Sequence, residues 1–144
     1  MKILRLVLGL CWSIHAALAA AAPLAAPDPE RPLWLRTPAV SPDGSRIAFA
    51  HGGQIWLVPA SGGEARALTS DQFYSHRPVW SPDGRRIAFA SRRHGNDDVF
   101  VMPADGGVIN RLTFHSAHDV PQAFSADGRE VLFASVRTGS AQAD

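Results

Sequence analysis

A repeat of about 40 residues is the feature that most limits how this chain can fold. The motif Ser-x-Asp-Gly begins at Ser41, Ser81 and Ser125, at spacings of 40 and 44 residues. A second motif recurs in phase with the first, because PASGGEARALT at 59–69 matches PADGGVINRLT at 103–113. Motifs that recur in the same order indicate a single structural unit that is written several times along the chain.

Turns and strands alternate within each unit, and the second copy shows the pattern most fully. The segment Pro82-Asp83-Gly84 predicts a tight turn, since proline presets φ, the aspartate side chain bonds backbone amides and glycine adopts positive φ. It precedes a strand at 86–90 whose apolar residues fill both faces, which predicts burial on both sides. Further extended segments are expected at 76–81, 99–103 and 109–113. The charged segment 92–98 is interpreted as an exposed hairpin loop.

The sequence therefore predicts an all-β fold of β-propeller blades, each a four-stranded antiparallel meander. Blades are expected at about 34–69, 76–113 and 120–144, inside a propeller segment at 33–144. That makes an incomplete ring of about two and a half blades, whereas rings close with about four to eight. We therefore expect an N-terminal fragment of a longer protein. A plain β-sandwich is the alternative fold, but it does not require motifs that recur in phase.

Residues 1–21 have the features of a secretory signal peptide. Lys2 and Arg5 form a basic start, an apolar core follows, and Ala17-Leu18-Ala19 is a small-x-small cleavage site. The apolar run is shorter and more interrupted than the ~20 residues of a spanning helix. Residues 22–32, rich in proline and alanine, are predicted to be a linker. We expect a periplasmic or secreted protein that has no membrane contact after removal of the signal.

Composition excludes one class of partner and one class of site. The formal net charge is only +1, so the chain lacks the concentrated basic face of a nucleic-acid binder. The single cysteine, Cys11, lies in the predicted signal peptide, which leaves the mature chain without a disulfide or a cysteine metal ligand. We expect no cofactor and no metal.

The second repeat carries its pattern of turn, strand and outer-strand residues at 80–84, 87–89, 100–103 and 111–113. This pattern resembles the WD-like β-propeller repeat of TolB, of tricorn proteases and of the prolyl-oligopeptidase group. The first repeat carries it less fully, with Val40 in place of the tryptophan, and the third has Ala126 in place of the proline. The resemblance covers about residues 34–139.

The resemblance implies a function in handling peptides or proteins. Since the first repeat follows soon after the signal, the chain looks most like the N-terminal propeller of a secreted tricorn-type serine peptidase. Such a propeller would guide or filter peptides in proteolysis, with catalysis in a C-terminal domain. The alternative is a non-enzymatic, TolB-like envelope propeller that binds protein partners. The expected partners are peptides or proteins, and the remaining blades and catalytic domain of the same full-length chain.

No catalytic or metal-binding residue is assigned within this chain. The Gly-x-Ser-x-Gly elbow of hydrolases is absent. His76 precedes Ser81 by five residues, but the other two turn serines have no such histidine, so a turn role is the interpretation for all three. His115, His118 and Asp119 form His-x-x-His-Asp, a set that could ligate zinc. They lie in a connection between repeats, for which a solvated loop is favoured.

Overall fold

The computed structural model describes residues 35–136, and every regular element within them is a β-strand. The strands are β1 (Arg36–Val40), β2 (Arg46–His51), β3 (Gln54–Pro59), β4 (Arg66–Ala67), β5 (Ser75–Trp80), β6 (Arg86–Ser91), β7 (Asp98–Pro103), β8 (Asn110–Arg111), β9 (Asp119–Phe124) and β10 (Val131–Ser135). Among these residues no helix is long and apolar enough to cross a bilayer. The predicted signal peptide at 1–21, the linker at 22–32 and the end of the third repeat at 137–144 lie outside the described residues.

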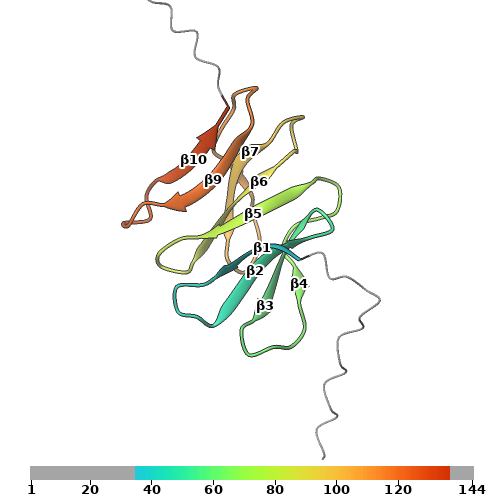
Figure 1. The fold of residues 1–144 in the computed structure, drawn as a ribbon, viewed down its shortest axis with the longest axis vertical. Coiled ribbons are helices and arrows are strands. Elements are labelled where there is room, and N and C mark those ends of the chain that lie inside the picture. Colours follow the sequence, from blue (N-terminus) through green and yellow to red (C-terminus); the bar gives the residue numbers. More distant parts are fainter. Residues whose placement is uncertain (1–34, 137–144) are drawn as a thin grey trace, which may run out of the picture. The chain divides into compact units, whose positions relative to one another are not determined.

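The strands form antiparallel sheets in which neighbours in sequence pair with each other (Figure 1). Blade 1 has the order β1-β2-β3-β4 and blade 2 the order β5-β6-β7-β8, while the described part of blade 3 is the pair β9-β10. Blade 1 contacts blade 2 and blade 2 contacts blade 3, with the first strands β1, β5 and β9 side by side in that order. The predicted all-β fold of propeller blades is confirmed, and the described blades form an unclosed series.

The Ser-x-Asp-Gly turns join the first and second strands of each blade, and they have the same geometry three times. In blade 2 the Ser81 hydroxyl donates to Asp83 Oδ1 at 2.6 Å and accepts the Arg86 N–H at 2.9 Å. The N–H of Gly84 donates to the Ser81 carbonyl at 2.9 Å, with φ at +66° in the left-handed region that favours glycine. The serine–aspartate contact recurs at 2.5 and 2.6 Å in blades 1 and 3. The repeated motif therefore specifies one closed turn.

One arginine clamp joins blade 1 to blade 2, and a second arginine clamp joins blade 2 to blade 3. Arg46 lies five residues after the turn serine of blade 1, and its Nη2 donates at 3.0 Å to the turn-glycine carbonyl of blade 2. Its guanidinium also lies 4.9 Å from the centre of the Trp80 ring. Arg86 repeats both contacts toward blade 3, at 2.6 Å from the turn-glycine carbonyl and 5.5 Å from the Phe124 ring centre. Each clamp combines a charged hydrogen bond with a cation–π contact, so it orients neighbouring blades.

The core lies between the sheets, because the second strand of a blade alternates its side chains between two neighbours. In β6, Ile87 and Phe89 join one apolar cluster with Ala48 of blade 1. Ala88 and Ala90 lie on the opposite face of the strand, and all four β6 residues are 0% exposed. The predicted burial of this strand on both faces is confirmed.

Two expectations for the second repeat are wrong. The outer strand predicted at 109–113 is only the two residues of β8, because the Thr113 hydroxyl, and not a backbone carbonyl, accepts the Val99 N–H at 3.0 Å. The loop predicted to be exposed at 92–98 ends in two buried aspartates, Asp97 and Asp98. Asp98 is 2.7 Å from the Arg111 guanidinium, which neutralises its buried charge.

Candidate functional site

The blades have two chemically different ends. The Ser-x-Asp-Gly turns lie at one end, and the β2–β3 and β6–β7 loops leave the antiparallel sheets at the other. The connections that lead into β5 and β9 reach the same end as these loops. We define the loop end as residues 51–54, 68–74, 92–97 and 112–118. Loops on a rigid sheet are where binding residues concentrate, so the loop end is the candidate functional site.

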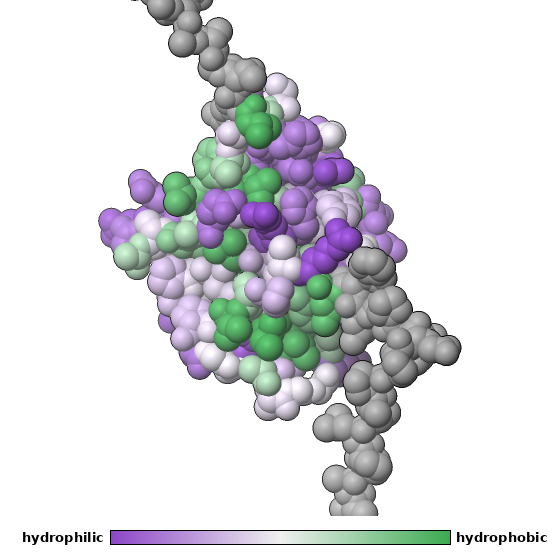
Figure 2. Space-filling model, in the orientation of Figure 1, coloured by the Kyte–Doolittle hydropathy of each residue, from purple (hydrophilic) through white to green (hydrophobic). Residues whose placement is uncertain are grey.

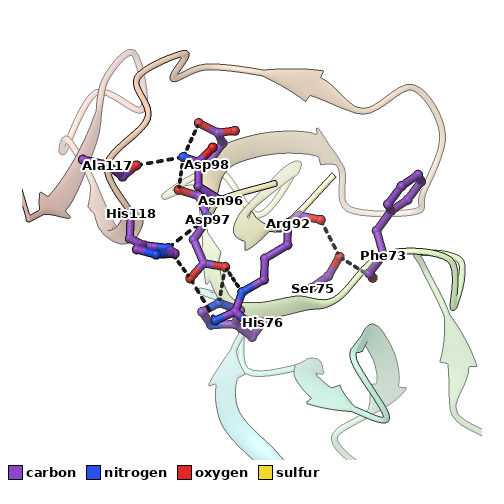
Figure 3. A network of polar contacts seen from close by, with 10 residues as sticks. Phe73, Ser75, His76, Arg92, Asn96, Asp97, Asp98, Ala117 and His118 are labelled. Carbon is purple, nitrogen blue, oxygen red and sulfur yellow. Dashed lines mark hydrogen bonds and ion pairs between the residues drawn. The ribbon is translucent and has the colours of Figure 1, made fainter. Parts of the chain in front are cut away.

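Asp97, the residue before β7, is the centre of a polar cluster at the loop end (Figure 3). Its Oδ1 lies 3.0 Å from Arg92 Nε and 3.2 Å from His76 Nε2. Its Oδ2 lies 3.2 Å from Nδ1 of His118. These partners come from its own hairpin loop, from β5 and from the connection to blade 3. Asp97 therefore joins three segments, through its carboxylate to Arg92 and His76 and through its backbone N–H to His118.

The Asp97 side chain is 8% exposed, and its surroundings favour the ionised form. Burial raises the pKa of this carboxyl, but hydrogen bonds from Arg92 and His76 outweigh burial and leave the pKa below its ordinary value. An ionised carboxylate can only accept hydrogen bonds, so Nε2 of His76 carries the proton in this contact. The Asp97 backbone N–H donates to Nδ1 of His118 at 3.2 Å.

Asn96 ties the same hairpin loop to the connection between blades 2 and 3. Its Nδ2 donates to the carbonyls of His115 and Ala117, at 2.9 and 2.8 Å. The segment 115–118 is therefore held against the β6–β7 loop by both side chains of the Asn96-Asp97 pair. This arrangement makes the loop end of blades 2 and 3 one preorganised surface.

A cavity of about 490 Å³ lies beside the Asp97 cluster, at the junction of blades 1 and 2. Its lining includes Arg36 of β1, His51 of β2 and Tyr74 just before β5. The Tyr74 ring lies 5.3 Å from the His76 ring, and the Arg92 guanidinium lies 5.3 Å from the Tyr74 ring centre. The cavity and the cluster therefore share a wall. An aromatic ring, an imidazole and a guanidinium around such a volume are typical of a pocket for a small ligand or a peptide segment.

Gly53 allows this wall to pack closely. Its φ is +78°, and a Cβ at this position would lie 3.0 Å from Cδ2 of Tyr74. Its carbonyl accepts the Ser75 N–H at 2.7 Å, which ties the β2–β3 loop of blade 1 to β5. Both the backbone conformation and the Tyr74 ring therefore exclude a side chain here.

The first strand of blade 1 and the first strand of blade 2 each contain a β-bulge next to the site. Thr37 and Arg77 adopt positive φ values of 49° and 53°, and the strand register shifts at these points. Such a conformation is uncommon for residues other than glycine, asparagine and aspartate. The bulge directly follows Arg36 and His76, and bulges re-aim the neighbouring side chains. The strained positions therefore flank the cavity and the Asp97 cluster.

The turn serines lie at the opposite end from this site. The Ser81 hydroxyl contacts Asp83 and the backbone of Arg86, whereas His76, five residues earlier, contacts Asp97. The structure therefore does not bring the histidine and the serine together as a nucleophile and its base.

The aspartates of the three turns are held in the ionised form. A hydrogen bond from the neighbouring serine lowers the pKa of Asp43 to about 2, and the same contact lowers the pKa of Asp83 and of Asp127. A carboxylate with so low a pKa is a weak general base at neutral pH. The turn geometry accounts for both members of each serine–aspartate pair.

The residues of the His-x-x-His-Asp motif have different partners. Nδ1 of His115 accepts the Ala117 N–H at 3.0 Å, while His118 lies against Asp97. Asp119 is fully buried at the start of β9. Within residues 35–136 no three histidine, cysteine or acidic side chains are placed to hold a metal ion.

Sequence reasoning missed Asp97 as a site residue. The strands β3 and β7 are equivalent, so Asp97 stands where blade 1 has Gly53. A polar residue that departs from the repeat, directly before a buried strand, is the signal that could have singled it out.

Comparisons with known proteins agree with the repeat architecture. Residues 32–144 match the family described as "Tricorn protease N-terminal beta propeller domain". A structure of TolB from Agrobacterium tumefaciens is 34% identical with a TM-score of 0.63, over 72% of this chain and 39% of that one. TolB from Acinetobacter baumannii is 25% identical with a TM-score of 0.61, over 73% and 27%.

The tricorn protease structure is 25% identical with a TM-score of 0.59, over 68% of this chain and 10% of that one. No curated protein sequence matches the chain. The chain thus spans less than half the length of each of these three structures.

Proposed function

Because the chain belongs to the family of tricorn protease N-terminal β-propeller domains, we propose that it is the peptide-handling propeller segment of a serine peptidase. In this proposal the loop end binds extended peptides and guides or filters them. Catalysis lies in a domain outside residues 1–144. The family match over residues 32–144 is the observation that carries the proposal.

The geometry of the loop end supports peptide binding. The cavity between blades 1 and 2 offers the Tyr74 ring, the His51 imidazole and the Arg36 guanidinium, groups that suit side chains and backbone carbonyls of a peptide. The Asp97 cluster keeps the adjoining wall in place with four ordered polar groups. A preorganised wall lowers the entropic cost of binding a flexible ligand.

A location outside the cytoplasm is part of the proposal. The predicted signal peptide at 1–21 supports export, and the likeness to TolB structures is consistent with an envelope or secreted protein. The remaining blades and the catalytic domain are proposed to belong to the same polypeptide, since the chain covers only 10% of the tricorn protease structure.

Peptide binding by the full chain tests the proposal. Binding is measured by fluorescence anisotropy with fluorescein-labelled, unstructured ten-residue peptides of different net charge. We expect Tyr74→Ala to weaken binding roughly five- to tenfold, as expected for loss of an aromatic anchor. The matched control is Val108→Ala, which truncates an exposed side chain after the turn at the other end of blade 2. Equal affinities of Tyr74→Ala and wild type, or no binding at all, would contradict peptide handling at the loop end.

The 34% identity to a TolB structure favours a second candidate, a non-enzymatic envelope propeller that binds protein partners. The two candidates differ in the sequence that the reading frame encodes after Asp144. A serine-peptidase domain, and peptide hydrolysis by the full-length product, would support the first. Further blades and then a stop, with no hydrolysis, would support the second.

A further inference from the structure

Histidines are distributed unequally between the loop end and the opposite end, which holds the Ser-x-Asp-Gly turns and is called the turn end. All histidines within residues 35–136 lie at the loop end or directly beside it, and none lies at the turn end. They are His51, His76, His94, His115 and His118. An unperturbed histidine titrates near pH ~6.5, closer to neutrality than any other side chain. The charge of the loop end therefore changes between neutral and mildly acidic conditions.

Acidic side chains have the opposite distribution. Among the exposed aspartates and glutamates within residues 35–136, only Asp71 lies at the loop end. The others lie in or next to the turns of the turn end: Asp43, Glu64, Asp83, Asp105, Asp127 and Glu130. The remaining acids of this part of the chain, Asp97, Asp98 and Asp119, are buried. A negatively charged ligand therefore meets little exposed negative charge at the loop end.

Arg93 in the β6–β7 loop adds a positive charge that no carboxylate of residues 35–136 balances. Its guanidinium lies 5.1 Å from the centre of the Phe73 ring and 5.8 Å from that of the Phe100 ring, and it forms no ion pair with these residues. Its Nε is buried without a hydrogen-bond partner among them. Figure 2 shows hydrophilic residues over the loop end of blade 2 and the connection to blade 3, at the upper right of the view. This hydrophilic surface carries more cationic than anionic groups.

His76 and His118 face one carboxylate from two different segments (Figure 3). Asp97 Oδ1 lies 3.2 Å from His76 Nε2, and Asp97 Oδ2 lies 3.2 Å from His118 Nδ1. Arg92 contacts the same carboxylate, and the Tyr74 ring lies 5.3 Å from the His76 ring. Because the pKa of Asp97 is below its ordinary value, this carboxylate stays ionised over the range in which histidines titrate. Each proton that these two imidazoles take up therefore adds positive charge to the wall of the cavity.

The other three histidines contact no acidic side chain within residues 35–136. The His94 ring stacks on the Phe100 ring at 6.1 Å, and the His51 ring meets the Trp56 ring edge-on at 6.1 Å. Nδ1 of His115 accepts the Ala117 N–H at 3.0 Å. The charge that these imidazoles gain on protonation is therefore available to a ligand.

We infer that the loop end selects peptide segments rich in aspartate and glutamate, and that it binds them more tightly as the pH falls from 7.5 to 5.5. The inference rests on the proposed function, because it names the class of peptide that the loop end takes. The carboxylates of such a peptide supply the negative charge that the loop end lacks, and complementary charge gives specificity. With ordinary pKa values of ~3.9 and ~4.3, they remain ionised at pH 5.5 while the histidines gain protons.

Three ten-residue peptides that differ at four positions test the inference. These positions are all glutamate, all glutamine or all lysine, and the ends are acetylated and amidated so that only side chains differ in charge. Binding of the rhodamine-labelled peptides to the full chain is measured by fluorescence anisotropy at pH 7.5 and 5.5. We expect the glutamate peptide to bind roughly three- to tenfold more tightly at pH 5.5, and the glutamine peptide to change less than twofold. Added salt should reduce the difference, because it screens exposed charges.

Exposed acidic positions at the two ends provide matched variants. Asp71→Asn removes the exposed acid of the loop end and should tighten binding of the glutamate peptide roughly twofold at both pH values. Glu64→Gln makes the same kind of change at the turn end and should leave the affinity unchanged. Equal effects of the two variants would show that the peptide does not bind at the loop end and would overturn the inference.

Histidine variants test the source of the pH response. His94→Gln/His115→Gln leaves the contacts of Asp97 in place and should reduce the response to about half, and adding His118→Gln should reduce it further. Circular dichroism on each variant confirms that the sheets are intact. A pH response that stays unchanged in both variants overturns the inference.

The peptide series also separates the inference from the proposed function. Equal affinities for the three peptides, or a preference for the lysine peptide, would overturn the inference and leave peptide handling in place. If no peptide binds at either pH, both the proposed function and the inference are wrong. Binding of phosphatidylglycerol vesicles without binding of the glutamate peptide would identify an anionic lipid surface as the ligand and would also overturn the inference.

Discussion

Replacing Ser81 by alanine tests whether the repeated serine closes a turn or serves as a nucleophile. The Ser81 side chain is 0% exposed, accepts the Arg86 N–H at 2.9 Å and donates to Asp83 at 2.6 Å. A hydrogen bond contributes about 0.5–1.5 kcal/mol, and an N–H left without a partner costs about 1–3 kcal/mol. We therefore expect Ser81→Ala to lower the free energy of unfolding by roughly 1–3 kcal/mol.

Blade 3 provides an internal comparison for this effect. Ser125 makes the same contacts, at 2.6 Å to Asp127 and 2.9 Å from the Glu130 N–H, but its turn is exposed to water. Water can replace the lost partner there, so Ser125→Ala should cost only about 0.5–1 kcal/mol. Ser70→Ala, at an exposed position outside the turns, is the control and should lie within about 0.5 kcal/mol of wild type.

Urea unfolding followed by tryptophan fluorescence gives the three free energies. In parallel, the wild-type chain is treated with a fluorophosphonate probe of serine hydrolases, and we expect no labelling of Ser81. A neutral Ser81→Ala variant, a larger loss at Ser125 than at Ser81, or labelling of Ser81 would refute the assignment of these serines to turns.

Three further predictions concern the clamp, the cavity wall and the turn aspartates. Arg86→Met should lower the free energy of unfolding by about 1.5–3 kcal/mol, and hydrogen-exchange protection should weaken first in β9 and β10. The control Arg85→Met, at an exposed position, should have little effect. Gly53→Ala and Gly52→Ala both place alanine at positive φ, which should lower the free energy of unfolding by about 1–2 kcal/mol in each case. Only the new Cβ of Gly53→Ala would also contact the Tyr74 ring, so thermal unfolding should show a larger loss of stability for Gly53→Ala than for Gly52→Ala. The pKa of Asp43 is about 2 in the folded chain, against an ordinary value of 3.8. The ionised Asp43 therefore contributes its full stabilisation above pH 3.8, and this contribution is lost as the pH falls toward 2. The midpoints of urea unfolding at pH 5, 3.5 and 2 should decline in that order.

The features that could be predicted from the sequence are those that recur. Each copy of the turn motif specifies the same hydrogen bonds locally, and the IAFA strand is apolar on both faces because it lies between two sheets. Local turn chemistry and side-chain periodicity need no knowledge of the neighbours, so blades and turns follow from the residue pattern alone.

The candidate site could not be predicted, because it depends on contacts between segments that the repeat does not relate. Asp97 meets His76 and His118, each 21 residues away in sequence, and the contact with His118 also requires the connection to blade 3 to pack against blade 2. The positive φ of Arg77 could not be predicted either, because its side chain disfavours this conformation.

Peptide binding by this propeller segment is proposed to occur at the loop end and not at the turn end. Amide hydrogen exchange of the full chain, with and without the ten-residue peptides, distinguishes the two because each end is reported by its own amides. We expect added protection at 51–54, 74–76 and 92–97, with none at the turns 42–45 and 82–85. Protection at the turns with an unchanged loop end would show that the proposed binding site is wrong.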